Sequence, residues 1–196
     1  MQKGITLAEL VIVLLIIGIL AAVILPVITA KTTEARYTQA IADLDAIKTA
    51  ITSYQSDVGN FPPSDPGFAG CSLMRKALVA GLGTGNASWK GPYLDMKLER
   101  TDTTGNILDS WNNPYIYVAF ADYTTASAST AGGMIGTGAT YGPDTGGFFN
   151  PNTYQIFSMG MNGYTDQGDN ADLTGKRGTD ADDVNNWYGD ERKRTH

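Results

Sequence analysis

The stretch that decides the fold is GITLAELVIVLLIIGILAAVILPVITA, which runs from Gly4 to Ala30. From Leu10 to Ala30 no side chain is ionisable, and this length is enough to cross a hydrocarbon core of about 30 Å as an α-helix. Glu9 stands at the mouth of the segment, where a carboxylate is costly, although less so than the roughly 2.5–3.5 kcal/mol of a charge at the helix centre. Pro26 lies inside the helical run, where it removes a backbone hydrogen bond. An interpretation of the segment must therefore explain its length, Glu9 and Pro26 together.

Two common kinds of apolar N-terminal segment explain these features incompletely. A secretory signal peptide has a basic first region and an apolar core of roughly 7–15 residues. Here a single lysine, Lys3, precedes the core, and the core is longer. A plain transmembrane anchor explains the length but gives no reason for Glu9 or Pro26.

A third interpretation accounts for all three features. Lys3 and Gly4 followed by ITLAEL resemble the N-terminus of type IV pilins and pseudopilins, with their class III leader. The resemblance implies that residues 1–4 are the leader and that a prepilin peptidase cuts between Gly4 and Ile5. Glu9 and Pro26 then become the fifth and twenty-second residues of the mature chain, as in that family. The family also implies methylation of the new amine, although Ile5 departs from its usual phenylalanine.

The resemblance suggests a physical role for Glu9. Cleavage creates an α-amine at Ile5, which is largely protonated at neutral pH. Within a bundle of apolar helices, the amine of one subunit can face Glu9 of another, and a charge in such surroundings needs a partner. We therefore expect residues 5–30 to be a transmembrane and assembly helix of a homo-oligomeric filament. Packing of the helices would supply the adhesion, and the ion pair would set the alignment.

The helix is predicted to continue beyond the membrane as an amphipathic helix over residues 31–57. Gly59 and Pro62 end the pattern, while Asp43, Asp45 and Lys48 fall off its apolar side. Because the apolar stripe is too short for a coiled coil, we expect it to pack on a sheet of the same chain. The stripe has spacings of three and four residues and consists of Tyr37, Ile41, Leu44, Ile47, Ile51 and Tyr54.

The remaining residues, 58–196, are predicted to form one globular domain. A short helical patch is expected around Leu73–Val79. Two segments, 113–120 (NPYIYVAF) and 153–160 (TYQIFSMG), alternate in the manner of strands. Residues 124–147 suggest an exposed hairpin or insertion, and residues 164–190 a loop rich in aspartate. The predicted fold class is therefore α+β and pilin-like, with a long helix packed on a small antiparallel sheet with long loops.

This second half sharpens the resemblance to the major pseudopilin of type II secretion. The resemblance implies a single-pass protein of the bacterial inner membrane with its C-terminal domain in the periplasm. The implied partners are the prepilin peptidase, minor pseudopilins and an inner-membrane assembly platform. The motifs occur in the family's order and are YQSDVGNFP (54–62), WKGPYL (89–94), LDSWNNPYIY (108–117), YQIFSMGMNG (154–163) and DDVNNW (182–187).

Aspartates crowd the C-terminal loop. They are a solvated acidic surface or a site for Ca²⁺, which takes six to eight oxygen ligands in irregular geometry. The EF-hand register is missing. The six residues are Asp166, Asp169, Asp172, Asp180, Asp182 and Asp183.

The resemblance implies one structural Ca²⁺ in this region. Its ligands would be the carbonyl oxygens of Met159 and Tyr164 and the side chains of Asn162, Asp182 and Asp183. Asn162 stands where the family usually has aspartate and brings no charge, which implies a weaker site. The inserted residues 165–179 also depart from the shorter family loop.

Composition excludes several functions. The formal net charge is −6, and no basic cluster precedes the extreme C-terminus, which argues against nucleic acid as a partner. The single histidine, His196, leaves no Ser-His-Asp triad and no histidine-based zinc site. Cys71 is the only cysteine, and we favour a buried apolar role for it over a reactive thiol. We therefore expect a protein that is not an enzyme.

Two alternatives to a pseudopilin remain open. A type IV major pilin, which builds surface fibres for adhesion or motility, has the same N-terminal signature. A membrane-anchored enzyme or carbohydrate-binding module could use Trp89, Trp111 and Trp187. We favour core anchoring for these tryptophans, because each lies among turn residues.

Overall fold

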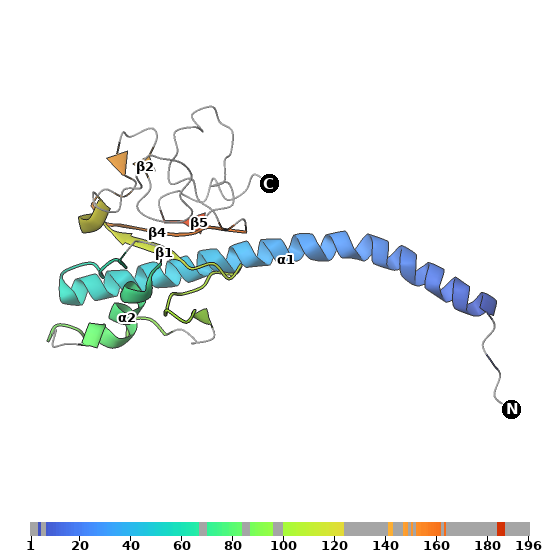
Figure 1. Ribbon diagram of the computed structural model, residues 1–196, viewed down its shortest axis with the longest axis horizontal. Coiled ribbons are helices and arrows are strands. Elements are labelled where there is room, and N and C mark those ends of the chain that lie inside the picture. The colour runs from blue at the N-terminus through green and yellow to red at the C-terminus, as the bar shows by residue number, and fades with distance from the viewer. Residues whose placement is uncertain are drawn as a thin grey trace. The chain divides into compact units, whose positions relative to one another are not determined.

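The computed structural model describes residues 4, 7–66, 70–83, 87–95, 100–123, 141–142, 147–148, 150, 152–161, 163 and 184–186. The chain divides into two units, Met1–Thr38 and Gln39–His196, and we treat each by itself. Helix α1, Leu7–Val58, runs through both of them (Figure 1).

The first unit contains the apolar part of α1. Helical structure continues through Pro26, and the large apolar side chains between Leu7 and Ile28 that the structure describes are 50–80% exposed. Within the described residues, α1 is the one helix long and apolar enough to cross a membrane. The predicted assembly helix spans residues 5–30, of which residues 5 and 6 lie outside the described part of the chain, and its role in assembly stays a prediction.

In the second unit, α1 buries one stripe of side chains. The predicted members Leu44, Ile47, Ile51 and Tyr54 are buried and Ile41 is half-buried. Tyr37 belongs to the first unit and is half-buried there. The prediction for Asp43 was wrong, because this carboxylate lies on the buried stripe and is 8% exposed. The cause is an ion pair, described below.

The predicted end of the helix is confirmed. α1 ends at Val58, and Gly59 follows with a φ of +86°, in the left-handed region that favours glycine. The Gly59 N–H donates to the Gln55 carbonyl oxygen at 2.8 Å. The glycine therefore closes the last turn before the prolines redirect the chain.

Helix α2, Ser72–Ala80, confirms the predicted helical patch. The carboxylate of Asp65 accepts hydrogen bonds from the N–H groups of Ser72 and Leu73, at 2.7 and 2.6 Å, and so caps its first turn. Two short 3₁₀ helices, η1 (Gly81–Gly83) and η3 (Phe120–Asp122), follow α2 and β1 respectively.

Strands β1, Ile116–Ala119, and β4, Tyr154–Ser158, confirm the two predicted strands and pair antiparallel. The loop prediction for residues 164–190 was wrong at Val184–Asn185, which form β5 on the other side of β4. So short a strand leaves no alternating pattern in the sequence. β5 forms because its backbone pairs with the edge of β4.

A separate antiparallel pair, β2 (Tyr141–Gly142) and β3 (Gly147–Phe148), lies at the end of the predicted hairpin or insertion. Most of that segment falls outside the described residues.

Both faces of the central strands are buried. On one face, the Tyr117 hydroxyl donates to the Pro62 carbonyl oxygen at 2.9 Å. Strand geometry turns the neighbours of Tyr117 to the opposite face. There an apolar cluster contains Ile116, Val118, Tyr123, Phe157 and Met159. The sheet is therefore an interior layer, and Figure 1 shows β1 and β4 running beside the second half of α1.

Candidate assembly and metal-binding sites

The predicted assembly residue Glu9 lies in the first turn of α1, and it is exposed. The positive end of the helix dipole favours a carboxylate at this position. Of the two processing residues, Gly4 is described and Ile5 falls outside the described residues. The cleavage site and the role of Glu9 stay predictions.

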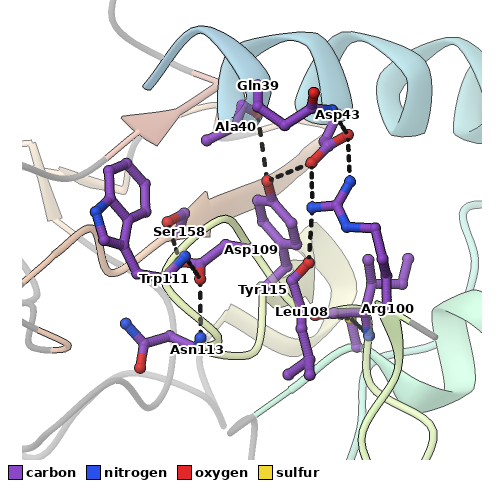
Figure 2. A network of polar contacts seen from close by, with 12 residues as sticks. Gln39, Ala40, Asp43, Arg100, Leu108, Asp109, Trp111, Asn113, Tyr115 and Ser158 are labelled. Carbon is purple, nitrogen blue, oxygen red and sulfur yellow. Dashed lines mark hydrogen bonds and ion pairs between the residues drawn. The ribbon is translucent and has the colours of Figure 1, made fainter. Parts of the chain in front are cut away.

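An ion pair fastens α1 to the segment before β1. Both carboxylate oxygens of Asp43 accept from the Arg100 guanidinium, at 2.9 and 2.6 Å, and Gln39 Nε2 donates to the same carboxylate at 2.8 Å. The Asp43 side chain is 9% exposed and that of Arg100 31%. Hydrogen bonding to Asp43 raises the pKa of Arg100, although burial opposes it. Figure 2 shows this bidentate arrangement.

Two backbone carbonyl oxygens take part in the same network around Asp43 and Arg100. Arg100 Nη2 also donates to the Leu108 carbonyl oxygen at 3.1 Å. The Tyr115 hydroxyl donates to the Ala40 carbonyl oxygen at 3.3 Å and lies 3.5 Å from the Asp43 carboxylate. Burial raises the pKa of Tyr115, so the phenol stays protonated and remains a donor. Sequence reasoning missed this network, because nothing in a predicted loop pairs Arg100 with a helical residue 57 positions earlier.

A second carboxylate, Asp109, organises its own turn before β1 and contacts Ser158 at the end of β4. It is 5% exposed and accepts from the Trp111 and Asn113 N–H groups at 2.9 and 2.8 Å, and from the Ser158 hydroxyl at 2.5 Å. Burial raises the pKa of Asp109, and the hydrogen bond from Ser158 is the largest opposing influence. Figure 2 shows Asp109 between Ser158 and Asn113.

Both backbone groups of Gly160 are held by side chains of this network. Its N–H donates to the Ser158 hydroxyl oxygen at 3.1 Å, and its carbonyl oxygen accepts from Asn113 Nδ2 at 2.9 Å. Gly160 has a φ of +61°, which a residue with a Cβ adopts only with strain.

Of the five predicted calcium ligands, the structure describes Met159. Met159 is 6% exposed in the apolar cluster with Ile116 and Val118, and the predicted ligand is its backbone carbonyl oxygen. Asn162, Tyr164, Asp182 and Asp183 fall outside the described residues. Among the residues that the structure describes, no group of three or more histidine, cysteine, aspartate or glutamate side chains is placed to hold a metal.

The strand register concerns two residues next to predicted ligands. Ser158, directly before Met159, pairs with Val184, directly after Asp183. The described ends of β4 and β5 are therefore neighbours, while the segment with Asp182 and Asp183 lies outside the described residues. The donor set consists of carbonyl, amide and carboxylate oxygen atoms, which are the ligands that Ca²⁺ prefers.

The tryptophans of the alternative binding function and the cysteine have structural roles where the structure describes them. Trp89 Nε1 donates to the Ala77 carbonyl oxygen at 2.9 Å, and its ring lies edge-on to Tyr93. Trp111 is half-buried beside Asp109, and Trp187 falls outside the described residues. Cys71 is fully buried, and burial raises the pKa of its thiol to about 12. Little reactive thiolate is therefore present at neutral pH, which confirms the apolar interpretation.

A membrane-length apolar helix that continues into a helix packed on a small antiparallel sheet defines the class, a pilin-like α+β protein. Residues 27–140 match the family described as Type II secretion system (T2SS), protein G. The chain belongs to this protein G family.

The curated relatives include type II secretion core proteins and type IV pilins. The chain is 33% identical over 118 residues to the type II secretion system core protein G of Pseudomonas aeruginosa, covering 60% of this chain and 74% of the relative. To the core protein G of Escherichia coli it is 27% identical over 138 residues, covering 69% and 86%. To the type IV major pilin protein PilE of Neisseria gonorrhoeae it is 32% identical over 152 residues, covering 70% and 90%. No solved structure gives a significant match.

Proposed function

We propose that this protein is the major pseudopilin of a type II secretion-like system, a structural subunit of a helical filament rooted in the inner membrane. The observation that carries the proposal is the match of residues 27–140 to the protein G family. The exposed apolar surface of α1 between Leu7 and Ile28 supports it, because such a surface needs lipid or other helices around it. The proposal gives the chain no catalytic role.

Assembly follows from the N-terminal residues. A prepilin peptidase removes residues 1–4, and the subunit waits in the membrane with its C-terminal domain in the periplasm. The amine of Ile5 on one subunit then pairs with Glu9 on another as the helices bundle. An inner-membrane platform and minor pseudopilins act with it, and growth of the filament moves substrates outward.

A structural Ca²⁺ is the second part of the proposal. Met159, Tyr164, Asn162, Asp182 and Asp183 would hold it, and the ion would replace repulsion in the acidic loop with shared coordination. Binding to the folded state alone stabilises that state. The pairing of Ser158 with Val184 supports this assignment.

A type IV major pilin is the second candidate. The observation in its favour is the alignment with the Neisseria pilin, which covers more of this chain than the alignment with the Pseudomonas protein G, 70% against 60%. A surface fibre and a pseudopilus need the same N-terminal helix. The match to the protein G family favours the pseudopilus.

Deletion of the gene, with complementation, separates the two candidates. For a pseudopilin, exported enzymes should accumulate in the periplasm and disappear from the medium, while surface adhesion and twitching stay normal. Loss of adhesion or twitching with normal export would show that the protein is a pilin.

A further inference from the structure

We propose that the ion pair between Asp43 and Arg100 sets the register of α1 against the sheet, so that the helix packs in one position along its axis. The inference goes beyond the proposed function, because it concerns how the domain selects a single packing. It assigns a task to a buried charge pair that hydrophobic packing alone does not need.

The buried side of α1 repeats itself along the helix axis. Its residues recur at intervals of seven, close to two helical turns and about 10 Å. A helix that slides by this interval returns apolar side chains to most of the same apolar positions. Hydrophobic contact is non-directional, so it distinguishes such positions only by size and shape. The rows are Ala40, Ile47 and Tyr54 on one line, Leu44 and Ile51 on a second, and Asp43 and Ala50 on a third.

Asp43 is the exception in this pattern. Among the buried residues of α1 in the described part of the chain, it carries the one charge. A slide in one direction puts its carboxylate into the buried place of Ala50, and a slide in the other puts Ala50 opposite Arg100. Either way, one charge of the pair is left in buried or partly buried surroundings without its partner.

Arg100 marks a fixed position on the side of the sheet. Its Nη2 donates to the Leu108 carbonyl oxygen at 3.1 Å, and the Leu108 N–H donates to the Arg100 carbonyl oxygen at 2.8 Å. The next residue back, Ile107, accepts from the Tyr115 N–H at 2.9 Å, directly before β1. The guanidinium is therefore tied to the segment that leads into the sheet, and Figure 2 shows it between Leu108 and Asp43.

The other polar contacts of α1 discriminate less between positions. Gln39 lies on the helix itself and moves with it. The Tyr115 hydroxyl donates to the Ala40 carbonyl oxygen, but every turn of a helix offers carbonyl oxygens. Lys90 pairs with Asp57 at 3.0 Å, but the lysine side chain is 72% exposed and water solvates its charge after a slide.

The expected discrimination follows from the exposure of the pair. The Asp43 side chain is 9% exposed and that of Arg100 31%, so separating them costs less than separating a fully buried pair. We expect the pair to lower the population of a displaced helix about 30–100-fold. Replacing both residues with leucine removes this penalty and adds apolar contact. The double variant should therefore stay folded but lose its single register.

Distances between spin labels test the register in full-length protein in detergent micelles. One nitroxide is attached at Thr49→Cys on the exposed side of α1, and the second at Phe120→Cys or Met161→Cys, which are exposed at opposite ends of β1 and β4. A slide along the strands changes at least one of the two distances. The native Cys71 is fully buried, so it stays unlabelled.

The wild type should give one distance for each label pair. Asp43→Leu with Arg100→Leu should add a second distance at a population of at least about 10%, while its thermal unfolding midpoint stays above that of Arg100→Ala. The matched control is Lys90→Ala, which removes the other ion pair that joins α1 to a distant segment. It should keep the wild-type distances.

Each outcome decides the inference. A single wild-type distance in the folded double leucine variant would show that packing alone sets the register, and the inference would be wrong. A second distance in Lys90→Ala of similar population would show that the loss of any ion pair loosens the helix, which also overturns it. Should the double leucine variant not fold, Asp43→Asn with Arg100→Gln removes both charges with little change in shape and decides in the same assay.

Discussion

Replacing Arg100 with alanine should destabilise the protein by about 2–3 kcal/mol. Removing one partner of a fully buried ion pair costs about 3–5 kcal/mol, because it leaves a buried charge without compensation. Here the Arg100 side chain is 31% exposed and Asp43 keeps its hydrogen bond from Gln39, so the expected cost is smaller. For a chain of this size, that cost lowers the thermal unfolding midpoint by about 4–12 °C. Circular dichroism of the full chain in detergent micelles measures it.

Two variants serve as controls. Lys48→Ala removes an exposed pair with Asp45, whose side chains are 43% and 65% exposed, and should cost less than about 0.5 kcal/mol. The double variant Asp43→Leu with Arg100→Leu replaces the pair by apolar groups and should be more stable than Arg100→Ala. If Arg100→Ala costs no more than Lys48→Ala, the ion pair does not hold α1 and the reasoning is wrong.

Three further predictions concern processing, calcium and acid. Mass spectrometry of the protein extracted from membranes should find the amino terminus at Ile5, and a start elsewhere would contradict the leader prediction. Calcium should raise the unfolding midpoint of chelated protein by an amount that follows RT ln(1 + [L]/Kd). Asp182→Ala and Asp183→Ala should each abolish this rise, while Asp169→Ala should not. Burial tends to raise the pKa of Asp102, but hydrogen bonds from its own turn lower it from 3.8 to about 2. Because the folded-state pKa is the lower one, this stabilisation is present above about pH 4 and is lost as pH falls toward 2. Asp102→Asn should flatten that part of a plot of stability against pH.

The parts of the fold that depend on local patterns were predictable. Spacings of three and four placed Leu44, Ile47 and Ile51 on the buried side of α1, and Gly59 marked its end. Alternation in two segments placed β1 and β4. Each of these signals is carried by neighbouring residues, so a single sequence contains it.

The parts that depend on long-range partners were not predictable. A carboxylate in a helix is expected on the solvated side, and Asp43 is buried only because Arg100 reaches it from a distant loop. β5 has one strong strand-forming residue, Val184, and exists because β4 offers it a free edge. Asp109 accepts hydrogen bonds from its own turn, but its contact with Ser158 spans 49 positions and no local pattern marks it.

The most direct test of the central claim is electron microscopy of filaments sheared from cells that contain the complete secretion machinery. Wild-type protein should give filaments composed of this chain. Glu9→Gln should be inserted and cleaved normally but give at least about tenfold fewer filaments, because its helix loses the charge that aligns neighbours on assembly. Absence of filaments from the wild type would contradict the account of the protein as a filament subunit. A filament yield from Glu9→Gln equal to that of the wild type would contradict the role given to Glu9.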